Sequence, residues 1–265
     1  MSEMVGKVVL VVGAAGGGNM GQGLARRFAA AGAQVVVAGR HQPPLERLAG
    51  EISGAFKLCD FEKKDDIDSL VAFTCERFGR VDVGINCTGW GLLKPFVETS
   101  EEDLQRMMDL QFKGPFQFMQ ALVKVMPRGA SIIMISSATA TIMLEQHAAY
   151  MGTKAGIDHV VRCVANEFGH KGIRVNSISP GVTETPMAGD ALKVPAIRKA
   201  FEAGYPLGRI GTIDDIAEAA LWLASERCFM TGQNLQVNGG LTLRRNPTMA
   251  EMGAAFASVT GHLSS

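Results

Sequence analysis

The sequence predicts an α/β protein made of one doubly wound domain, residues 1–265, in which helices cover both faces of a mostly seven-stranded parallel sheet. Three observations predict this fold class. Short apolar runs rich in Val and Ile recur, amphipathic stretches lie between them, and no Pro-, Ser- or Gly-rich linker divides the chain. Alternating strands and helices need crossover connections, which produce parallel sheets. Length alone would also allow two small domains.

The predicted strands are apolar runs without a polar alternation, as expected for strands that are buried on both faces. Two of the seven are weaker, at 55–59 and 234–237. The other five are residues 7–13, 33–39, 81–86, 131–136 and 173–179. Between the strands, apolar residues at helical spacing predict helices near 67–78 and 213–223.

Two segments break this alternation. Residues 186–208 mix apolar residues with several Gly and Pro, which predicts a substrate lid or an insertion. Residues 241–265, which end in "AAFASVTGHLSS", form a C-terminal extension. The extension could close over a pocket, reach a neighbouring subunit or be disordered, and the sequence leaves these three roles open.

Composition and charge argue against several classes of function. Lys and Arg number 26 against 26 Asp and Glu, whereas nucleic-acid and anionic-membrane surfaces usually need a basic excess. No apolar run is long enough to span a bilayer, and no spacing of Cys, His, Asp or Glu predicts a metal site. The five cysteines are widely spaced, so we expect free thiols in a reducing compartment and a cytoplasmic protein.

The first strand runs into "GAAGGGNMGQGLARRF", a glycine-rich turn that is followed by a helix. Glycines allow tight turns and let the backbone approach a pyrophosphate, whose charge is met by amides at the helix N-terminus. The pattern favours a dinucleotide site of Rossmann type over a flexible linker. The contacts are expected from residues of this turn: Gly13, Gly17, Asn19, Met20 and Gly21.

The end of the second strand indicates which dinucleotide binds. The stretch "VVVAGRH" has no acidic residue to accept hydrogen bonds from a free ribose 2′-hydroxyl, and its Arg40 could pair with a 2′-phosphate. This favours NADP(H). NAD(H) is the alternative if Arg40 is only a solvated surface residue.

Ser137, Tyr150 and Lys154 are the predicted catalytic residues. Tyr150 and Lys154 are four residues apart, which puts both on one face of a helix with the ammonium near the phenol. A free tyrosine ionises near pH ~10, and a neighbouring cation favours the phenolate. Ser137, at the end of a strand, could hydrogen-bond the substrate oxygen and polarise it. Without this context, a Tyr and a Lys at helical spacing would more often be an exposed pair.

Together these features resemble the short-chain dehydrogenase/reductase family over nearly the whole chain. Besides the Tyr-x-x-x-Lys pair with a serine thirteen residues earlier, "NCTG" at 86–89 is similar to the family's Asn-Asn-Ala-Gly segment. "IRVNSISPGVTETPM" resembles the sixth strand of the family and its Pro-Gly turn, and "GRIGTIDDIAEAALWLAS" and "TGQNLQVNGG" resemble the C-terminal region. In this order, the motifs are highly specific.

The resemblance implies a role for each matching residue. Tyr150 would be the acid/base, Lys154 would lower its pKa and hold the ribose hydroxyls, and Ser137 would orient the carbonyl. Asp60 would lie by the adenine and Thr185 at the nicotinamide carboxamide. The other cofactor-binding residues that the resemblance implies are Phe61, Asn86, Gly89, Pro180, Gly181 and Thr183.

Two departures from the family pattern bear on the site. The glycine-rich turn is about two residues longer than usual, with Asn19 near the second key glycine and Val12 in place of a threonine. Gln111 stands where the family usually has an asparagine that completes a proton relay. Its longer stem could still organise a water near Lys154 or could leave the relay impaired, so we expect slower proton exchange rather than inactivity.

The residues that the resemblance places around the substrate are mostly apolar. They are Trp90, Leu92, Leu93, Ile142, Met143, Leu144, His147 and Met187. We therefore predict an NAD(P)-dependent carbonyl reductase or alcohol dehydrogenase for a bulky apolar or aromatic ketone or secondary alcohol. The alternative for several of these residues is packing in the core, and for His147 an exposed loop position.

Two other functions and the assembly state stay open. The chain could be a 3-oxoacyl carrier-protein reductase. It could also be a dinucleotide-sensing protein with impaired catalysis, for which Gln111 and the altered turn are the support. By resemblance to the family we also expect a homotetramer or, failing that, a dimer.

Overall fold

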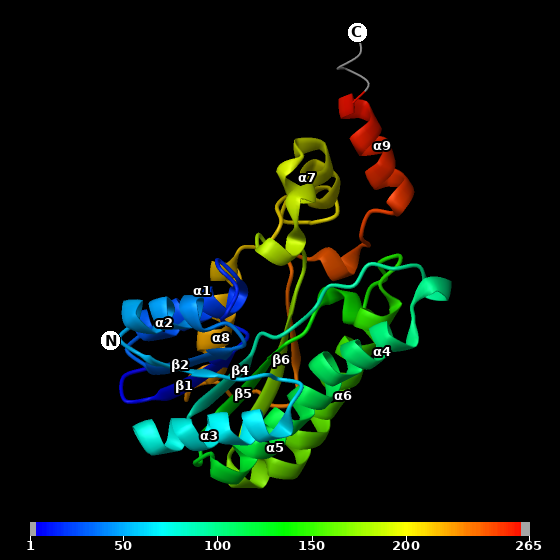
Figure 1. Cartoon of the computed structure of the whole chain (residues 1–265). Coiled ribbons are helices and arrows are strands. Elements are labelled where there is room, and N and C mark those ends of the chain that lie inside the picture. Colours follow the sequence, from blue (N-terminus) through cyan, green and yellow to red (C-terminus); the bar gives the residue numbers. More distant parts are fainter. Residues whose placement is uncertain (1–3, 261–265) are drawn as a thin grey trace.

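Seven parallel strands form one sheet across the middle of the molecule, in the order β3-β2-β1-β4-β5-β6-β7 (Figure 1). The computed structural model of the chain describes residues 4–260. The strands are β1 (Val8–Val12), β2 (Gln34–Gly39), β3 (Ala55–Leu58), β4 (Val83–Asn86), β5 (Ser131–Ile135), β6 (Arg174–Pro180) and β7 (Asn234–Val237). All seven predicted strands are confirmed, and their ends differ by one or two residues at most.

The central strand β1 shows why the strands appear as uninterrupted apolar runs. Each of its residues is buried, because helices cover both faces of the sheet. It pairs with β2 on one side and with β4 on the other. The chain leaves β1 and β4 toward opposite edges of the sheet, and this reversal opens a crevice at the carboxyl ends of the two strands.

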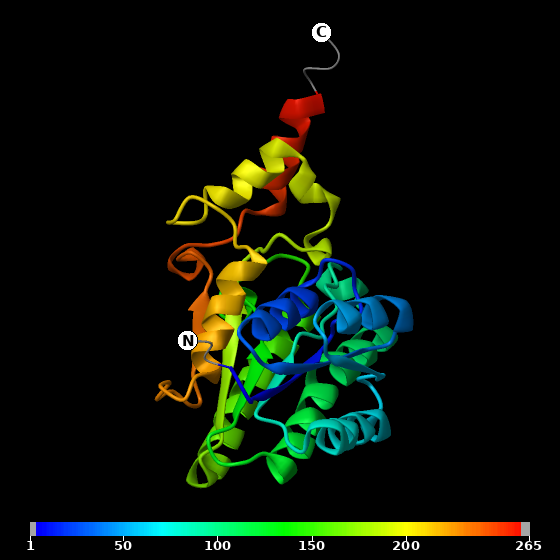
Figure 2. The ribbon, with the colours of Figure 1, turned by 90° about the vertical axis from the view of Figure 1, so that its left-hand side faces the viewer.

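Helices cover each face of the sheet (Figures 1 and 2). One face carries α1 (Met20–Ala30), α2 (Gln42–Glu51) and α8 (Ile213–Ala224). The other face carries α3 (Lys64–Phe78), α5 (Gly114–Val125) and α6 (Ala148–Phe168). Alternate residues of β1 serve the two cores: Val9 packs with Phe28 of α1, whereas Leu10 packs in the cluster of Phe118 of α5.

Local signals determine where several helices begin and where one is interrupted. Ser100 forms a capping box with Asp103 at the start of α4 (Glu101–Met108). Between α4 and α5, residues Asp109–Lys113 form a π-helical turn that buries Gln111. Such turns are frequent at functional sites, but the 3.6-residue pattern of the sequence did not predict this one.

Two helices lie beyond the carboxyl ends of the strands and pack side by side (Figures 1 and 2). α7 (Pro195–Glu202) lies within the predicted lid, 186–208. α9 (Met249–Thr260) belongs to the predicted C-terminal extension, 241–265, of which residues 261–265 lie outside the described part. Both segments that break the alternation of strands and helices therefore contribute a helix beyond the carboxyl ends of the strands, where the crevice opens.

Phe118→Ala should lower the free energy of unfolding by about 3–5 kcal/mol, because the ring is fully buried between α5 and the sheet and its removal leaves a cavity. Urea unfolding measures the loss. Phe116→Ala is the matched control on the same helix, and a clearly smaller loss is expected because Phe116 is 39% exposed. Equal losses in the two variants would contradict this assignment of the core.

Candidate active site

A cavity of about 480 Å³ opens at the carboxyl ends of the central strands. Most of the residues predicted to bind the cofactor line it: Gly13, Asn19, Met20, Arg40, Phe61, Gly89, Tyr150, Lys154, Pro180, Gly181, Thr183 and Thr185. Four other predicted residues do not line it: Gly17, Gly21, Asp60 and Asn86. Its lining also includes residues that the sequence did not indicate, among them Gly16, Gly39, His41, Cys59, Cys87 and Thr88.

Close backbone contacts hold the glycine-rich turn. Gly13 has a φ of +88°, and a Cβ atom there would lie 2.7 Å from the carbonyl carbon of Cys87. A Cβ atom on Gly21 would lie 2.6 Å from the Gly13 carbonyl oxygen, so α1 packs directly on the turn. Gly21 therefore supports the turn from behind the cavity, and Gly17 has open space around it.

Asn19, the residue that departs from the family's glycine, caps α1. Its side-chain oxygen accepts a hydrogen bond from the Gln22 amide at 3.0 Å, and its Nδ2 donates to the Gly13 carbonyl oxygen at 2.8 Å. The first helical residue, Met20, lines the cavity. The positive end of the α1 dipole therefore borders the cavity, where it would favour an anionic group.

Arg40 lies at the end of β2, as the sequence indicated, and its side chain is exposed. Its guanidinium is 3.8 Å from a carboxylate oxygen of Glu62. Asp60 is placed differently from the expected adenine contact. Its carboxylate lies 3.5 Å from the Lys63 ammonium and accepts from the Glu62 amide, outside the cavity lining.

Ser137, Tyr150 and Lys154 come together at the wall of the cavity. Ser137 follows β5, and its hydroxyl is 2.8 Å from the Thr139 hydroxyl. Tyr150 and Lys154 lie one turn apart on α6, with the ammonium nitrogen 5.6 Å from the centre of the phenol ring. The buried Lys154 ammonium donates to the Ile135 carbonyl oxygen at 2.7 Å. The arrangement places a hydroxyl and a phenol at the wall of the cavity, with an ammonium beside the phenol ring.

Burial controls the pKa values of this group. It raises the pKa of Tyr150 to about 12, while the interaction with Ser137 acts in the opposite direction. It lowers the pKa of Lys154 to about 8, while the acidic groups of Asp158 and Cys87 act in the opposite direction. The family resemblance implied that Lys154 lowers the pKa of Tyr150. In this structure the shift is upward, because desolvation of the phenol dominates.

Asp158, which the sequence analysis did not single out, is a further titratable group near Lys154. It lies one helical turn after Lys154, and one of its oxygens accepts from Ser136 and Asn234, each at 2.7 Å. The other oxygen, Oδ1, is buried without a hydrogen-bond partner among residues 4–260. Burial raises the pKa of Asp158. Its four-residue spacing from Lys154 was the available signal in the sequence.

Gln111 is buried beside the end of β4. Its Nε2 contacts the Met107 sulfur and donates to the Thr153 hydroxyl at 3.4 Å. Its Oε1 has no partner within the described chain, and a Cβ atom on Gly89 would lie 3.1 Å from it. The amide thus reaches the residue before Lys154 rather than the lysine itself.

A second cavity, of about 210 Å³, adjoins the first and shares Ser137, Tyr150, Pro180 and Gly181 with it. It is lined by several of the predicted substrate residues: Leu93, Leu144, His147 and Met187. Further apolar residues come from the lid and from the chain after β7: Leu192, Phe201 and Leu241. The lining is therefore mostly apolar.

Four predicted substrate residues do not line this pocket. The Arg106 guanidinium of α4 lies 4.2 Å above the ring of Trp90, which packs at the edge of a core cluster. Leu92 presents its carbonyl oxygen to His147, and Met143 is 69% exposed. Ile142 packs instead in a small core cluster beneath the lid.

His147 is buried against Tyr150, rather than exposed on a loop. The two rings are stacked with their centroids 4.3 Å apart, and Nδ1 of His147 is 2.7 Å from the Leu92 carbonyl oxygen. Burial lowers the pKa of His147. The imidazole is therefore neutral at pH 7 and fixed in orientation.

The C-terminal extension reaches the pocket, which was one of its three open roles. Asn246 lines the pocket, and its Nδ2 donates to the Met143 carbonyl oxygen at 3.4 Å. The Met249 amide donates to a carboxylate oxygen of Glu145 at 3.1 Å. These contacts join the extension to the loop between Ser137 and Tyr150.

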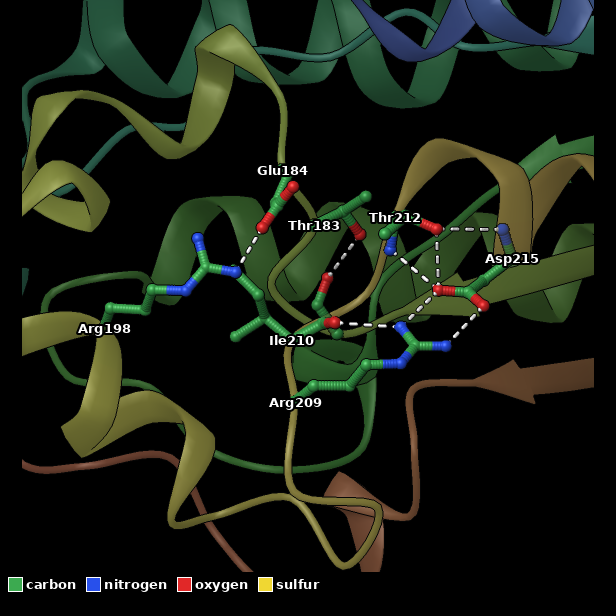
Figure 3. Close-up of polar contacts among 8 residues, drawn as sticks. Thr183, Glu184, Arg198, Arg209, Ile210, Thr212 and Asp215 are labelled. Atoms are coloured by element: carbon green, nitrogen blue, oxygen red, sulfur yellow. Dashed lines mark hydrogen bonds and ion pairs between the residues drawn. The ribbon is translucent and has the colours of Figure 1, made fainter. Parts of the chain in front are cut away.

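Backbone pairing connects the two ends of the predicted lid, residues 186–208. Ion pairs lie beside each end (Figure 3). The Glu184 amide donates to the Gly211 carbonyl oxygen at 3.0 Å. Arg198 of α7 pairs with Glu184, while Arg209 makes two bonds of 2.7 and 2.8 Å to Asp215 at the start of α8. The Arg209 guanidinium lowers the pKa of Asp215. These contacts hold the predicted lid, residues 186–208, at both of its ends.

Residues 4–260 contain neither a cluster of metal ligands nor a helix able to span a membrane. No group of three or more His, Cys, Asp or Glu side chains there is placed to hold a metal ion. None of the helices in that range combines the length and the apolar character needed to cross a membrane.

The chain is similar to known proteins along nearly its whole length. A family model described as enoyl-(acyl carrier protein) reductase matches residues 13–242. The L-fucose dehydrogenase of Oryctolagus cuniculus is 35% identical over 253 residues, covering 93% of this chain and 88% of that protein. The 3beta-hydroxysteroid dehydrogenase 1 of Eggerthella lenta is 34% identical, covering 91% of this chain and 95% of that protein. The solved structure of a short-chain type dehydrogenase/reductase from Mycobacterium ulcerans has a TM-score of 0.89 at 29% identity and covers 94% of both chains.

Lys154→Met should change how stability depends on pH. Burial lowers the pKa of Lys154 from 10.5 to about 8, so between these values the unfolded chain binds a proton that the native protein does not. Wild-type stability should therefore rise with pH across this window, relative to the variant, by up to about 3 kcal/mol. Urea unfolding at a series of pH values measures this slope.

Lys124→Met is the control, because it removes a lysine that is exposed on α5. Other groups titrate in all three proteins, so only the difference in slope is compared. A Lys154→Met variant with the wild-type slope would contradict the burial of a titrating lysine.

Proposed function

Since the chain belongs to the short-chain dehydrogenase/reductase family and is a short-chain alcohol dehydrogenase, we propose that it transfers a hydride between NADP(H) and a bulky apolar or aromatic ketone or secondary alcohol, with Tyr150 as the acid/base. One observation carries the proposal. The large cavity and the smaller apolar pocket share Ser137 and Tyr150 in their linings, with Lys154 on the cofactor side. A substrate in the pocket would therefore meet a cofactor in the cavity at the tyrosine.

The cavity fits a nicotinamide dinucleotide. When bound, the cofactor supplies or accepts the hydride, and the chain binds and orients it. Gly13 and Gly16 line the cavity, and the N-terminus of α1 favours a pyrophosphate. Lys154 would hold the ribose hydroxyls, and Thr185 would hold the carboxamide.

Arg40 supports a preference for NADP(H). Its guanidinium is exposed at the end of β2, where no acidic residue is present to bind a free 2′-hydroxyl. Glu62 is 3.8 Å away, which leaves Arg40 free to pair more closely with a phosphate. NAD(H) remains the weaker expectation.

Tyr150 is suited to donate a proton when a ketone is reduced. With a pKa of about 12, the phenol is protonated at neutral pH. The Ser137 hydroxyl would bind the same carbonyl oxygen and orient it, which polarises the bond that accepts the hydride. The Lys154 ammonium, 5.6 Å from the ring centre, would stabilise the phenolate that remains after the proton has left.

The pocket supports a substrate with an apolar body. Leu144 and Met187 face it together with Phe201 of α7, so residues 186–208 are proposed as the substrate lid. The relatives' names include both a sugar dehydrogenase and a steroid dehydrogenase. The mostly apolar lining of the pocket in this chain favours an apolar substrate over a sugar.

Two alternatives are each favoured by one observation. The description of the matching family model names an enoyl-(acyl carrier protein) reductase, which favours a carrier-linked acyl substrate. For a carbonyl reductase this substrate would be a 3-oxoacyl carrier-protein thioester. Gln111 contacts Thr153 rather than Lys154, which favours a dinucleotide-sensing protein with impaired catalysis. Much faster turnover of a carrier-linked thioester than of simple ketones would establish the first. Cofactor binding without turnover of a broad carbonyl panel would establish the second.

The family resemblance also leads us to propose a homotetramer or a dimer in the cytoplasm. The exposed apolar side chains of Leu104, Met108 and Phe116 on α4 and α5 would suit an interface between copies. The five cysteines are free, as expected in a reducing compartment. Light scattering of the purified protein tests the assembly state.

Tyr150→Phe should lower kcat for ketone reduction by at least about 100-fold, because it removes the proton donor but keeps the ring that stacks on His147. Absorbance of the reduced nicotinamide measures turnover, with fluorescence titration of NADPH as a check on cofactor binding. Tyr205→Phe is the matched control, since Tyr205 lines neither cavity. Its hydroxyl oxygen only accepts from the backbone amide of Val182, at 2.6 Å. Equal losses of turnover in the two variants would overturn the role of Tyr150.

Arg40→Ala should weaken NADPH binding by about tenfold or more and weaken NADH binding much less, because only NADPH carries the phosphate that the guanidinium would bind. Fluorescence titration of both cofactors gives the ratio of dissociation constants. Arg26→Ala is expected to keep the wild-type ratio of dissociation constants, because it removes a guanidinium of α1 that pairs with Glu51 of α2. An unchanged ratio in Arg40→Ala would argue for NAD(H).

A further inference from the structure

The pocket beside Tyr150 holds no charged side chain. Its described lining contains no Asp, Glu, Lys or Arg, and most of its residues are apolar. A carboxylate, phosphate or ammonium group in it would lose its hydration without gaining a partner. The ligand of this pocket is therefore uncharged where it touches these walls.

His147 presents an unpaired acceptor to this pocket. A carbonyl oxygen can only accept, so the bond of 2.7 Å to Leu92 requires the proton on Nδ1. The ring is neutral because burial lowers the pKa of His147, and Nε2 therefore keeps its lone pair. Nε2 has no hydrogen-bond partner within the part of the chain that the structure describes. The residue is only 8% exposed and lines the pocket.

Stacking holds this acceptor beside the reacting group. The imidazole lies on the Tyr150 ring with the centroids 4.3 Å apart and the planes 26° apart. The bond to Leu92 prevents the ring from turning without loss of a buried hydrogen bond. Both residues line the pocket, so a substrate whose oxygen binds the Tyr150 hydroxyl lies in the same pocket as the imidazole.

Asn246 presents a second acceptor from a distant part of the chain. Its Nδ2 donates to the Met143 carbonyl oxygen, which leaves the side-chain oxygen without a partner among residues 4–260. The residue is 5% exposed and lines the same pocket as His147. The Arg245 guanidinium donates to its backbone carbonyl oxygen at 3.0 Å, which helps to hold the residue in place.

We propose that His147 and Asn246 bind a second hydroxyl group of the substrate, so that the enzyme selects diols and hydroxy ketones with an apolar ring over the corresponding simple alcohols and ketones. The inference rests on the proposed function and names the substrate class of the same pocket. A hydroxyl is an uncharged group that an alcohol substrate can carry. Its one O–H can donate to Nε2 of His147, and its oxygen can accept from the second Nδ2 hydrogen of Asn246, because only one of these hydrogens is used by Met143. The apolar walls hold the ring that bears the hydroxyls.

The expected selectivity follows from the small exposed fractions of the two residues, 8% for His147 and 5% for Asn246. When a site built to bind a hydroxyl meets an analogue without it, the polar groups of the site are left unpaired. This loss corresponds to a preference of about 10- to 100-fold in kcat/KM for the substrate that carries the second hydroxyl.

The test compares cyclohexane-1,2-diol with cyclohexanol as substrates of the full-length protein, with NADP as the oxidant. Wild type should prefer the diol, and the ratio of the two kcat/KM values should fall by about tenfold or more in His147→Phe, which keeps a ring to stack on Tyr150. Asn246→Leu should lower the same ratio, and it provides a second variant if the first does not fold.

His170→Phe is the matched control, because Nδ1 of His170 is also bonded to a carbonyl oxygen, that of Glu167, at 2.8 Å, but on the exposed surface. The ratio should stay at the wild-type value in this variant. A wild type that prefers cyclohexanol would overturn the proposal. So would His147→Phe if it slowed both substrates by the same factor, because His147 would then act only by positioning Tyr150.

Ligand-observed NMR makes the test independent of turnover. The diol should bind wild type more tightly than cyclohexanol does, and His147→Phe should remove the difference. If neither probe nor a broad carbonyl panel is turned over, the proposed function fails, while the binding ratio still decides the role of His147 and Asn246. Equal binding of the two probes to wild type would overturn that role whether or not the protein is active.

Discussion

The active site depends on a backbone contact that leaves no space for a Cβ atom. Where β1 ends, Gly13 lies against the backbone of Cys87 at the end of β4 and against the start of α1. A Cβ atom at Gly13 or at Gly21 would come within 2.7 Å of backbone atoms. The contact holds the turn and α1 at the carboxyl ends of the strands, where the connections of β1 and β4 diverge. Ser137 follows the carboxyl end of β5, so it lies in the wall of the same cavity.

Burial then determines the chemistry of that wall. Desolvation raises the pKa of Tyr150 and lowers that of Lys154, so that the phenol keeps its proton while the ammonium holds its proton less strongly. Asp158 lies one turn further along α6 and its carboxylate is tied to Ser136 and Asn234, which keeps a compensating acidic group near the lysine. The same desolvation destabilises the charged forms in the folded protein, a common feature of functional sites.

The pocket is completed by segments that come late in the chain. The lid contributes Phe201 on α7, and α7 packs on α9 of the C-terminal extension. Asn246 joins the extension to the loop that carries His147, through the Met143 carbonyl oxygen. The pocket is therefore built from three regions far apart in the sequence, while Ser137 follows a strand of the sheet and Tyr150 and Lys154 lie on a single helix. This division lets the pocket vary without disturbing the chemistry.

The sequence by itself determined the fold class, the seven strands and the meeting of Ser137, Tyr150 and Lys154. These follow from local patterns: uninterrupted apolar runs and a spacing of one helical turn. Only the tertiary structure decided which side chains reach the pocket. Trp90 was expected there, but Arg106 covers its ring, whereas Asn246 was not expected and lines the pocket. Such contacts join segments that are distant in the chain, and the desolvation that shifts the pKa values depends on all of these segments together. A local spacing of residues therefore encodes neither the pocket lining nor the pKa shifts.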